Sequence, residues 1–198
     1  IDHDILPLDK EFAIRDAKGR ALPAHLLKSR NDGSYWSIWV YEIPPMGFTT
    51  LRIEVDRNTS RVIPGGGNPT PVLENEFYRI TIDAQKGAVS SIFDKQLGRE
   101  LLDPQSDMAL GTVVYEELDN RHTMERLTNA NRDTTYVPLK KQWSSLTDIT
   151  ISPIATDKIW SSLKIHGQLP RCSDERGLEM EIRLYHTEKK IEFLYKTF

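Results

Sequence analysis

Carboxylates, histidines and a single cysteine are the residues of this chain that could do acid–base, metal or nucleophilic chemistry. Two carboxyl groups act as acid and nucleophile on a glycoside when about 5–5.5 Å separates them. The nearest candidates are Glu116 and Glu117, followed by Asp119. Adjacent residues of a strand point to opposite faces, so Glu116 and Glu117 cannot act as such a pair. We interpret them as a solvated strand end and predict no catalytic residue in this chain.

The histidines are scattered along the chain, which argues against a metal site. Zinc is held by clustered His, Cys, Asp or Glu residues at defined spacing, and the sequence contains neither HxxxH nor HxH. We therefore predict no metal ligand and no cofactor in this chain and interpret its histidines as surface residues: His3, His25, His122, His166 and His186. Cys172 has no second thiol and no histidine beside it in sequence, so an incidental thiol is favoured over a nucleophile.

The tryptophans and one polar segment are the features most typical of ligand binding. Sugar sites combine aromatic faces with planar polar side chains in loops. Four tryptophans could supply such faces, although core packing is the default role for each: Trp36, Trp39, Trp143 and Trp160. Among the polar segments, residues 119–133 (DNRHTMERLTNANRD) are the most typical of a binding loop, because they are rich in Asn, Arg and His. An ordinary exposed connection is the alternative interpretation of that segment.

The elements that must position these residues are strands. Residues 77–83 alternate between apolar and polar with period two, and after a glycine-containing turn Val89, Ser91 and Phe93 resume the alternation on one face. This pattern predicts a β-meander. We interpret its acidic residues as turn and loop residues rather than catalysts: Asp83, Asp94 and Glu100.

Similar alternating segments recur along the whole chain without a sustained helical period. Residues 35–41 and 48–55 predict a small sheet, and residues 178–185 and 191–195 predict a hairpin. We therefore predict an all-β fold, an antiparallel β-sandwich preceded by a small antiparallel β domain. The expected division is a small β domain at 1–60, a Gly/Pro linker at 61–72 and the N-terminal part of the large sandwich at 73–198.

Composition excludes some partners. The net charge is only −3, so we expect no nucleic acid. No apolar run approaches the roughly 18 residues of a membrane span, so we expect no membrane either. The single cysteine and the absence of a visible signal peptide favour a cytoplasmic location. Because the chain starts without Met in mid-pattern, we expect it to be a fragment of a longer protein.

Several phrases together resemble the C-terminal β-sandwich of the glycoside hydrolase family 38 α-mannosidases. The phrases that carry the resemblance in the meander are Glu74-Asn75, Phe77-Tyr78-Arg79, Asp83, Gly87, Ser91, Asp94-Lys95 and Arg99-Glu100-Leu101. The turn that begins at Asp16 and the segment 43–48 resemble the small β domain that precedes this sandwich, and residues 178–198 resemble a later hairpin. The similarity covers most of the chain in the right order, and none of its phrases is a catalytic signature.

The resemblance implies a galactose-mutarotase-like supersandwich downstream of a catalytic domain. Zinc and the carboxylate nucleophile of the retaining reaction would then lie in parts absent from this chain. The expected partners are that catalytic domain, mannosides and a second copy in a homo-oligomer. Loops of the sandwich approach the active site in the resembled family, so we predict that four residues contact the substrate cleft: Asn120, Arg121, His122 and Arg126.

Two alternatives stay open beside a non-catalytic part of an α-mannosidase. A free-standing carbohydrate-binding module would bind mannosides by itself. An aldose-epimerase-like enzyme on the same fold would need a Glu base and a His acid that converge on a concave face.

Overall fold

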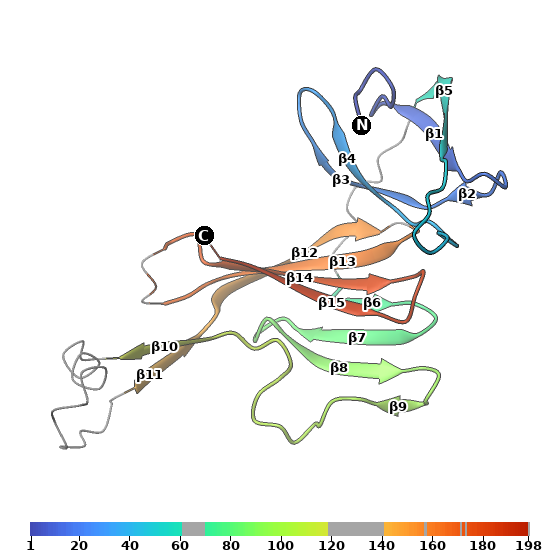
Figure 1. The fold of residues 1–198 in the computed structure, drawn as a ribbon. Coiled ribbons are helices and arrows are strands. Elements are labelled where there is room, and N and C mark those ends of the chain that lie inside the picture. Colours follow the sequence, from blue (N-terminus) through green and yellow to red (C-terminus); the bar gives the residue numbers. More distant parts are fainter. Residues whose placement is uncertain (61–69, 119–140, 157, 171, 173, 198) are drawn as a thin grey trace, which may run out of the picture. The chain divides into compact units, whose positions relative to one another are not determined.

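A computed structural model describes residues 1–60, 70–118, 141–156, 158–170, 172 and 174–197. The described residues form strands β1 to β15 and no helix, which confirms the predicted all-β class (Figure 1). Several antiparallel sheets are present, consistent with a β-sandwich. Nothing in the described part of the chain forms a helix that could span a membrane.

The chain divides into two compact units that do not follow chain order. Unit 1 consists of Ile1–Pro69, Pro153–Leu163 and Arg183–Glu192. Unit 2 consists of Thr70–Ser152, Lys164–Ile182 and Phe193–Phe198. Most of the predicted linker, residues 61–69, lies outside the described residues, so the predicted domain boundary stays a prediction.

Two small antiparallel sheets form the N-terminal part of unit 1. Their strands are β1 (Lys10–Arg15), β2 (Ala21–Leu22) and β5 (Arg52–Ser60), in the order β2-β1-β5, and the pair β3 (Ala24–Ser29) and β4 (Ser34–Ile38). The predicted strand at 48–55 therefore begins later, at Arg52, and runs on to Ser60. Arg52 pairs with Arg15, the last residue of β1, so the ladder has no partner strand before Arg52.

A four-stranded meander opens unit 2, as the alternation predicted. Its strands are β6 (Val72–Glu74), β7 (Tyr78–Asp83), β8 (Ala88–Asp94) and β9 (Arg99–Glu100), hydrogen-bonded in chain order. The buried face of β7 holds Ile80 and Ile82, which are 0% and 3% exposed.

The predicted face of β8 is wrong because the strand contains a bulge. Ile82 pairs with Val89 but Thr81 pairs with Ser91, so Ser90 is the extra residue. A bulge shifts the alternation by one residue. Val89 is consequently buried while Phe93, expected on the same face, is 37% exposed.

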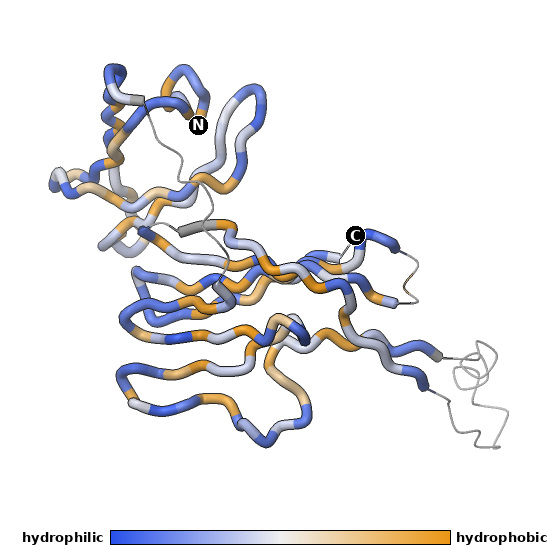
Figure 2. The backbone as a smooth tube through the Cα atoms, turned by 180° about the vertical axis from the view of Figure 1, so that it is seen from behind, coloured by the Kyte–Doolittle hydropathy of each residue, from blue (hydrophilic) through white to orange (hydrophobic). Residues whose placement is uncertain are grey.

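Two further sheets contain the remaining strands. Strands β10 (Val114–Leu118) and β11 (Lys141–Ser145) form an antiparallel ribbon. The other sheet has the order β12 (Thr147–Thr156), β13 (Trp160–Gln168), β14 (Leu178–Tyr185) and β15 (Ile191–Thr197). Figure 2 shows hydrophobic and hydrophilic residues interspersed along the backbone, and β14 buries Leu178, Met180 and Ile182 as predicted.

Within unit 2 the two four-stranded sheets contact each other at the turn after β7. Gly87 has φ 60°, and a Cβ at this position would lie 3.2 Å from Cγ2 of Ile165 and 3.3 Å from Cδ1 of Ile149. The turn thus packs against β12 and β13 so closely that a Cβ would crowd both isoleucines.

Candidate functional site

The four predicted contact residues lie in a segment outside the described part of the chain. Asn120, Arg121, His122 and Arg126 lie within 119–140, outside the described residues, so their role stays a prediction. The structure does describe β10 and β11, the strands that precede and follow this segment in the chain (Figure 1).

The register of the ribbon separates the adjacent glutamates, as predicted. Glu116 pairs with Trp143, and Glu117 pairs with Gln142. Because side chains alternate between the faces of a strand, Glu116 and Trp143 share one face while Glu117 points to the other. The two carboxyl groups therefore cannot act together on one bond.

Trp143 is the exposed member of the four tryptophans. Its side chain lies 64% in solvent, and its Nε1–H donates to Oε2 of Glu116 at 2.8 Å. The ammonium of Lys141 lies 3.2 Å from Oε1 and 3.3 Å from Oε2 of the same carboxylate. The hydrogen bond from Lys141, followed by that from Trp143, lowers the pKa of Glu116, so the carboxylate is ionised at neutral pH.

Of the other tryptophans, Trp160 is buried in unit 1, as the default interpretation predicted, while Trp36 and Trp39 are half-buried. Trp160 is 3% exposed, and its ring centroid lies 4.5 Å from that of His25 and 5.4 Å from that of Tyr185. Trp39 packs against the same cluster. Trp36 meets Phe12 edge to face at 4.8 Å and donates from Nε1 to Ser34 Oγ at 2.6 Å.

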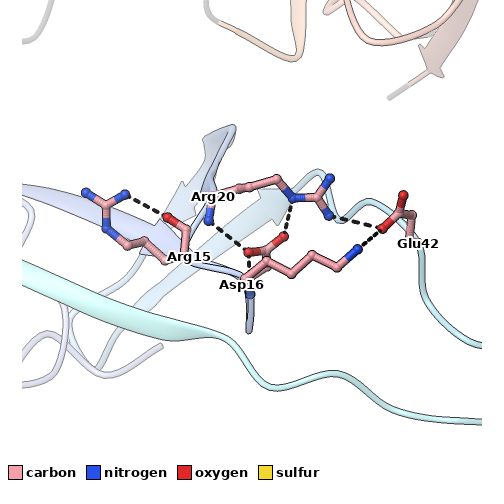
Figure 3. A network of polar contacts seen from close by, with 6 residues as sticks. Arg15, Asp16, Arg20 and Glu42 are labelled. Atoms are coloured by element: carbon pink, nitrogen blue, oxygen red, sulfur yellow. Dashed lines mark hydrogen bonds and ion pairs between the residues drawn. The ribbon is translucent and has the colours of Figure 1, made fainter.

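A charged network lies at the turn between β1 and β2 (Figure 3). The Arg20 guanidinium donates to Asp16 at 2.7 Å and to Glu42 at 3.4 Å, and Lys18 donates to Glu42 at 2.7 Å. Hydrogen bonds from Lys18 lower the pKa of Glu42, and those from Arg20 lower the pKa of Asp16 against the opposing effect of burial. Carboxylates that stay ionised in this way lack the proton that a general acid must give.

Two surface grooves occur among the described residues, one in each unit. A groove of about 190 Å³ beside the charged network is lined by Arg15, Asp16, Ala17, Gly19, Thr50, Arg52 and Glu54. Two of these lining residues, Arg15 and Glu54, form an ion pair with 2.8 Å between Nε and Oε2. A larger groove of about 380 Å³ in unit 2 lies along β8 and the segment 101–110.

The described histidines and Cys172 do not gather into a metal site. No group of three His, Cys, Asp or Glu that could hold a metal ion occurs among the described residues, so these residues do not fit zinc. His186 Nε2 lies 2.9 Å from Ser161 Oγ, and His166 Nε2 lies 2.9 Å from the carbonyl of Arg176. Cys172 is a free thiol.

Comparison with protein families decides the relationship of the chain. Residues 73–197 match the family described as the glycosyl hydrolases family 38 C-terminal domain. The chain belongs to this family. No curated protein matches the chain. The match begins at the meander and ends in β15, and it confirms the resemblance over these residues. The resembling segments near Asp16 and at 43–48 lie outside the match.

The phrases that resemble family 38 hold the turns of the meander by side-chain hydrogen bonds. Asn75 Oδ1 accepts the backbone N–H groups of Phe77 and Tyr78, both at 2.8 Å. Asp83 Oδ1 accepts the N–H of Gln85 at 2.9 Å and that of Lys86 at 3.2 Å. Such Asx-type bonds fix a tight turn. Asp83 therefore has a structural role, as predicted.

Asp94 and Glu100 complete the set of structural acids in this family 38 domain. Asp94, only 2% exposed, accepts the N–H groups of Gln96 and Leu97 at 2.9 and 3.0 Å. The Glu100 carboxylate accepts donors from four residues, as follows: Ser91 Oγ, Ile92 N, Leu101 N and Leu102 N. Glu100 thus binds the N–H of Ile92, on the strand that pairs with β9.

Sequence reasoning missed Lys141 and the arrangement of Glu116 with Trp143. The sequence predicts Trp143 as a core residue or a sugar-binding face and Glu116 as a solvated strand end. These residues come together across the ribbon, 25 and 27 positions apart. Only the register between β10 and β11 places them on one face, and no local pattern encodes that register.

Proposed function

We propose that this chain is a non-catalytic β-sandwich portion of a family 38 α-mannosidase. It would pack on the catalytic domain and help to shape the carbohydrate site. The observation that carries this proposal is the family match over residues 73–197. The structural use of Asp83, Asp94 and Glu100 supports it, because these carboxylates accept backbone N–H groups.

The proposed reaction of the whole protein is zinc-dependent retaining hydrolysis of α-mannosides. Zinc would stabilise developing charge at the substrate, and it would be held by residues of the catalytic domain. The part of this chain in the reaction would be to position the substrate. The segment with Asn120, Arg121, His122 and Arg126 is proposed to make that contact.

The test uses the longer protein that contains this chain. We expect it to hydrolyse p-nitrophenyl α-D-mannopyranoside with retention of configuration, and to lose activity when a chelator removes zinc and regain it when zinc is returned. Alanine at Arg121 and Arg126 should raise KM more than it lowers kcat, because these residues would contact the substrate away from the reacting atoms. Absence of α-mannosidase activity in the zinc-loaded protein would overturn the proposal.

A stand-alone carbohydrate-binding module is the second candidate. The 64% exposure of Trp143 favours it, because an exposed aromatic face is the usual contact for a sugar ring. It requires that the 198-residue chain bind mannosides in a protein without hydrolase activity. No specific observation in the described part of the chain favours the epimerase alternative.

A further inference from the structure

One face of the β10–β11 ribbon lies open to solvent. Val114 and Glu116 lie on this face of β10, and the register places Lys141, Trp143 and Ser145 opposite on the same face of β11. All five side chains are exposed. A strand normally directs its largest aromatic side chain to the core, so the exposed indole is the feature to explain.

The indole is held in a fixed orientation although it lies in solvent. Its Nε1–H bond to Glu116, at 2.8 Å, anchors one edge of the ring, and Lys141 in turn holds the Glu116 carboxylate through both oxygens. A ring fixed in this way loses less conformational entropy when a ligand stacks on it. The arrangement is therefore preorganised for binding.

The polar groups beside the ring keep unused hydrogen-bonding capacity. An ionised carboxylate offers about four acceptor positions, and Glu116 uses two at Oε2 and one at Oε1. The Lys141 ammonium carries three donors, and its side chain is 47% exposed. An acceptor and a donor thus stand side by side next to an aromatic face.

We propose that Trp143, Glu116 and Lys141 form a platform for one pyranose unit of an oligosaccharide. The C–H face of the sugar would stack on the indole, and two neighbouring hydroxyl groups would meet the free acceptor of Glu116 and the free donor of Lys141. The proposal rests on the proposed function in that the protein handles carbohydrate. It adds a site, its residues and the part of the sugar that each one contacts.

Other ligand classes fit this surface less well. The Glu116 and Lys141 charges balance each other, so this face has no excess charge to attract the phosphates of a nucleic acid or a free cation. An apolar peptide side chain would contact the ring but would leave the remaining hydrogen-bonding positions of Glu116 and Lys141 unused. A neutral polyol with one apolar face satisfies all three groups together.

The experiment measures sugar binding by the 198-residue chain. Acrylamide quenching of tryptophan fluorescence reports chiefly on Trp143, the most exposed tryptophan, and titration calorimetry gives the affinity. The probes are α-mannobiose, maltose and, as a polyol without a ring, sorbitol. We expect a disaccharide, but not sorbitol, to protect Trp143 from quenching and to give a measurable heat of binding in the calorimeter.

Substitutions test the role of each group. Trp143→Ala should weaken binding about tenfold, as expected for the loss of one aromatic contact. Trp143→Phe should lose less, because it keeps a ring but not the bond to Glu116, and Glu116→Gln should also weaken binding. The matched control is Phe48→Ala, which removes an 87% exposed aromatic residue from unit 1 and should leave binding unchanged.

The outcomes separate this platform from the proposed function. No protection by either disaccharide, or equal weakening by Trp143→Ala and Phe48→Ala, would overturn the platform even in an active mannosidase. Disaccharide binding that depends on Trp143 would support the platform even if the longer protein failed to hydrolyse mannosides.

Discussion

At the scale of single residues, several of the described carboxylates serve as hydrogen-bond acceptors for the backbone. Glu100 shows this most fully, with donors from Ser91, Ile92, Leu101 and Leu102. Burial by itself would raise the pKa of Glu100, but the bonds from Ser91 and the backbone amides lower it. An acid in such a setting stabilises a turn rather than donates a proton.

Replacing Glu100 with Ala should destabilise the domain by about 1–3 kcal/mol, because it leaves the N–H of Ile92 without its acceptor. The free energy of unfolding from urea titration measures the effect. Glu76→Ala is the matched control, since it removes an exposed glutamate of the same meander. Equal stability of the two variants would contradict the structural role of Glu100.

Glu74 should make the stability depend on pH. Hydrogen bonds from Lys95 and then Arg79 lower the pKa of Glu74 from 4.5 to about 2. Since the folded pKa lies below the unfolded one, this stabilisation is complete above pH 4.5 and is lost as the pH falls towards 2. The difference in urea midpoint between wild type and Glu74→Gln should therefore shrink across this range. A difference that stays constant would show that Lys95 and Arg79 do not act through the charge of Glu74.

At the scale of elements, turns and one bulge determine which faces of the meander are buried. Gly87 and Gly98 both adopt a positive φ, at 60° and 63°, in turns that follow β7 and β8. A Cβ at Gly87 would meet Ile165 and Ile149, whereas a Cβ at Gly98 would meet nothing within 4 Å. The first turn is therefore part of the contact between sheets, and the second is an exposed connection.

This difference gives a matched pair of substitutions. Gly98→Ala should cost only the backbone strain of a left-handed residue, about 1 kcal/mol. Gly87→Ala should cost roughly 1–3 kcal/mol more, because its methyl group also crowds Ile165 and Ile149. Chemical unfolding of both variants measures the two costs. Equal destabilisation would mean that the turn after β7 does not pack against the second sheet.

At the scale of the whole molecule, unit 1 joins segments that are distant in the chain. His25 and Trp39 come from the N-terminal part. Ile159 directly precedes β13, Trp160 begins β13 and Tyr185 ends β14. Arg183 lies over the Trp160 ring at 4.8 Å. The β3–β4 pair and the residue after it therefore share a core with the ends of strands that follow more than a hundred residues later.

Two measurements test this shared core. Trp160→Ala should destabilise unit 1 by about 3–5 kcal/mol, whereas Trp143→Ala at the exposed position should change stability little. Residues 1–69 expressed alone should lack the amide chemical-shift dispersion of a folded domain, because the aromatic partners of His25 and Trp39 are missing. A stable, well-dispersed 1–69 fragment would contradict the composition of unit 1.

The sequence by itself determined the all-β class, the meander, the family and the structural role of Asp83. These features depend on local alternation and on turn chemistry within a few residues, which a sequence displays directly. It also indicated that most tryptophans belong in a core.

Only the tertiary structure decided which residues meet across strands and units. The bulge at Ser90 exchanged the faces of β8, the ribbon register brought Trp143 and Lys141 to Glu116, and the core around Trp160 joined distant segments. The physical reason is common to all three. Register and packing depend on the pairing of whole strands, and a shift of one residue reverses every face without changing the local pattern.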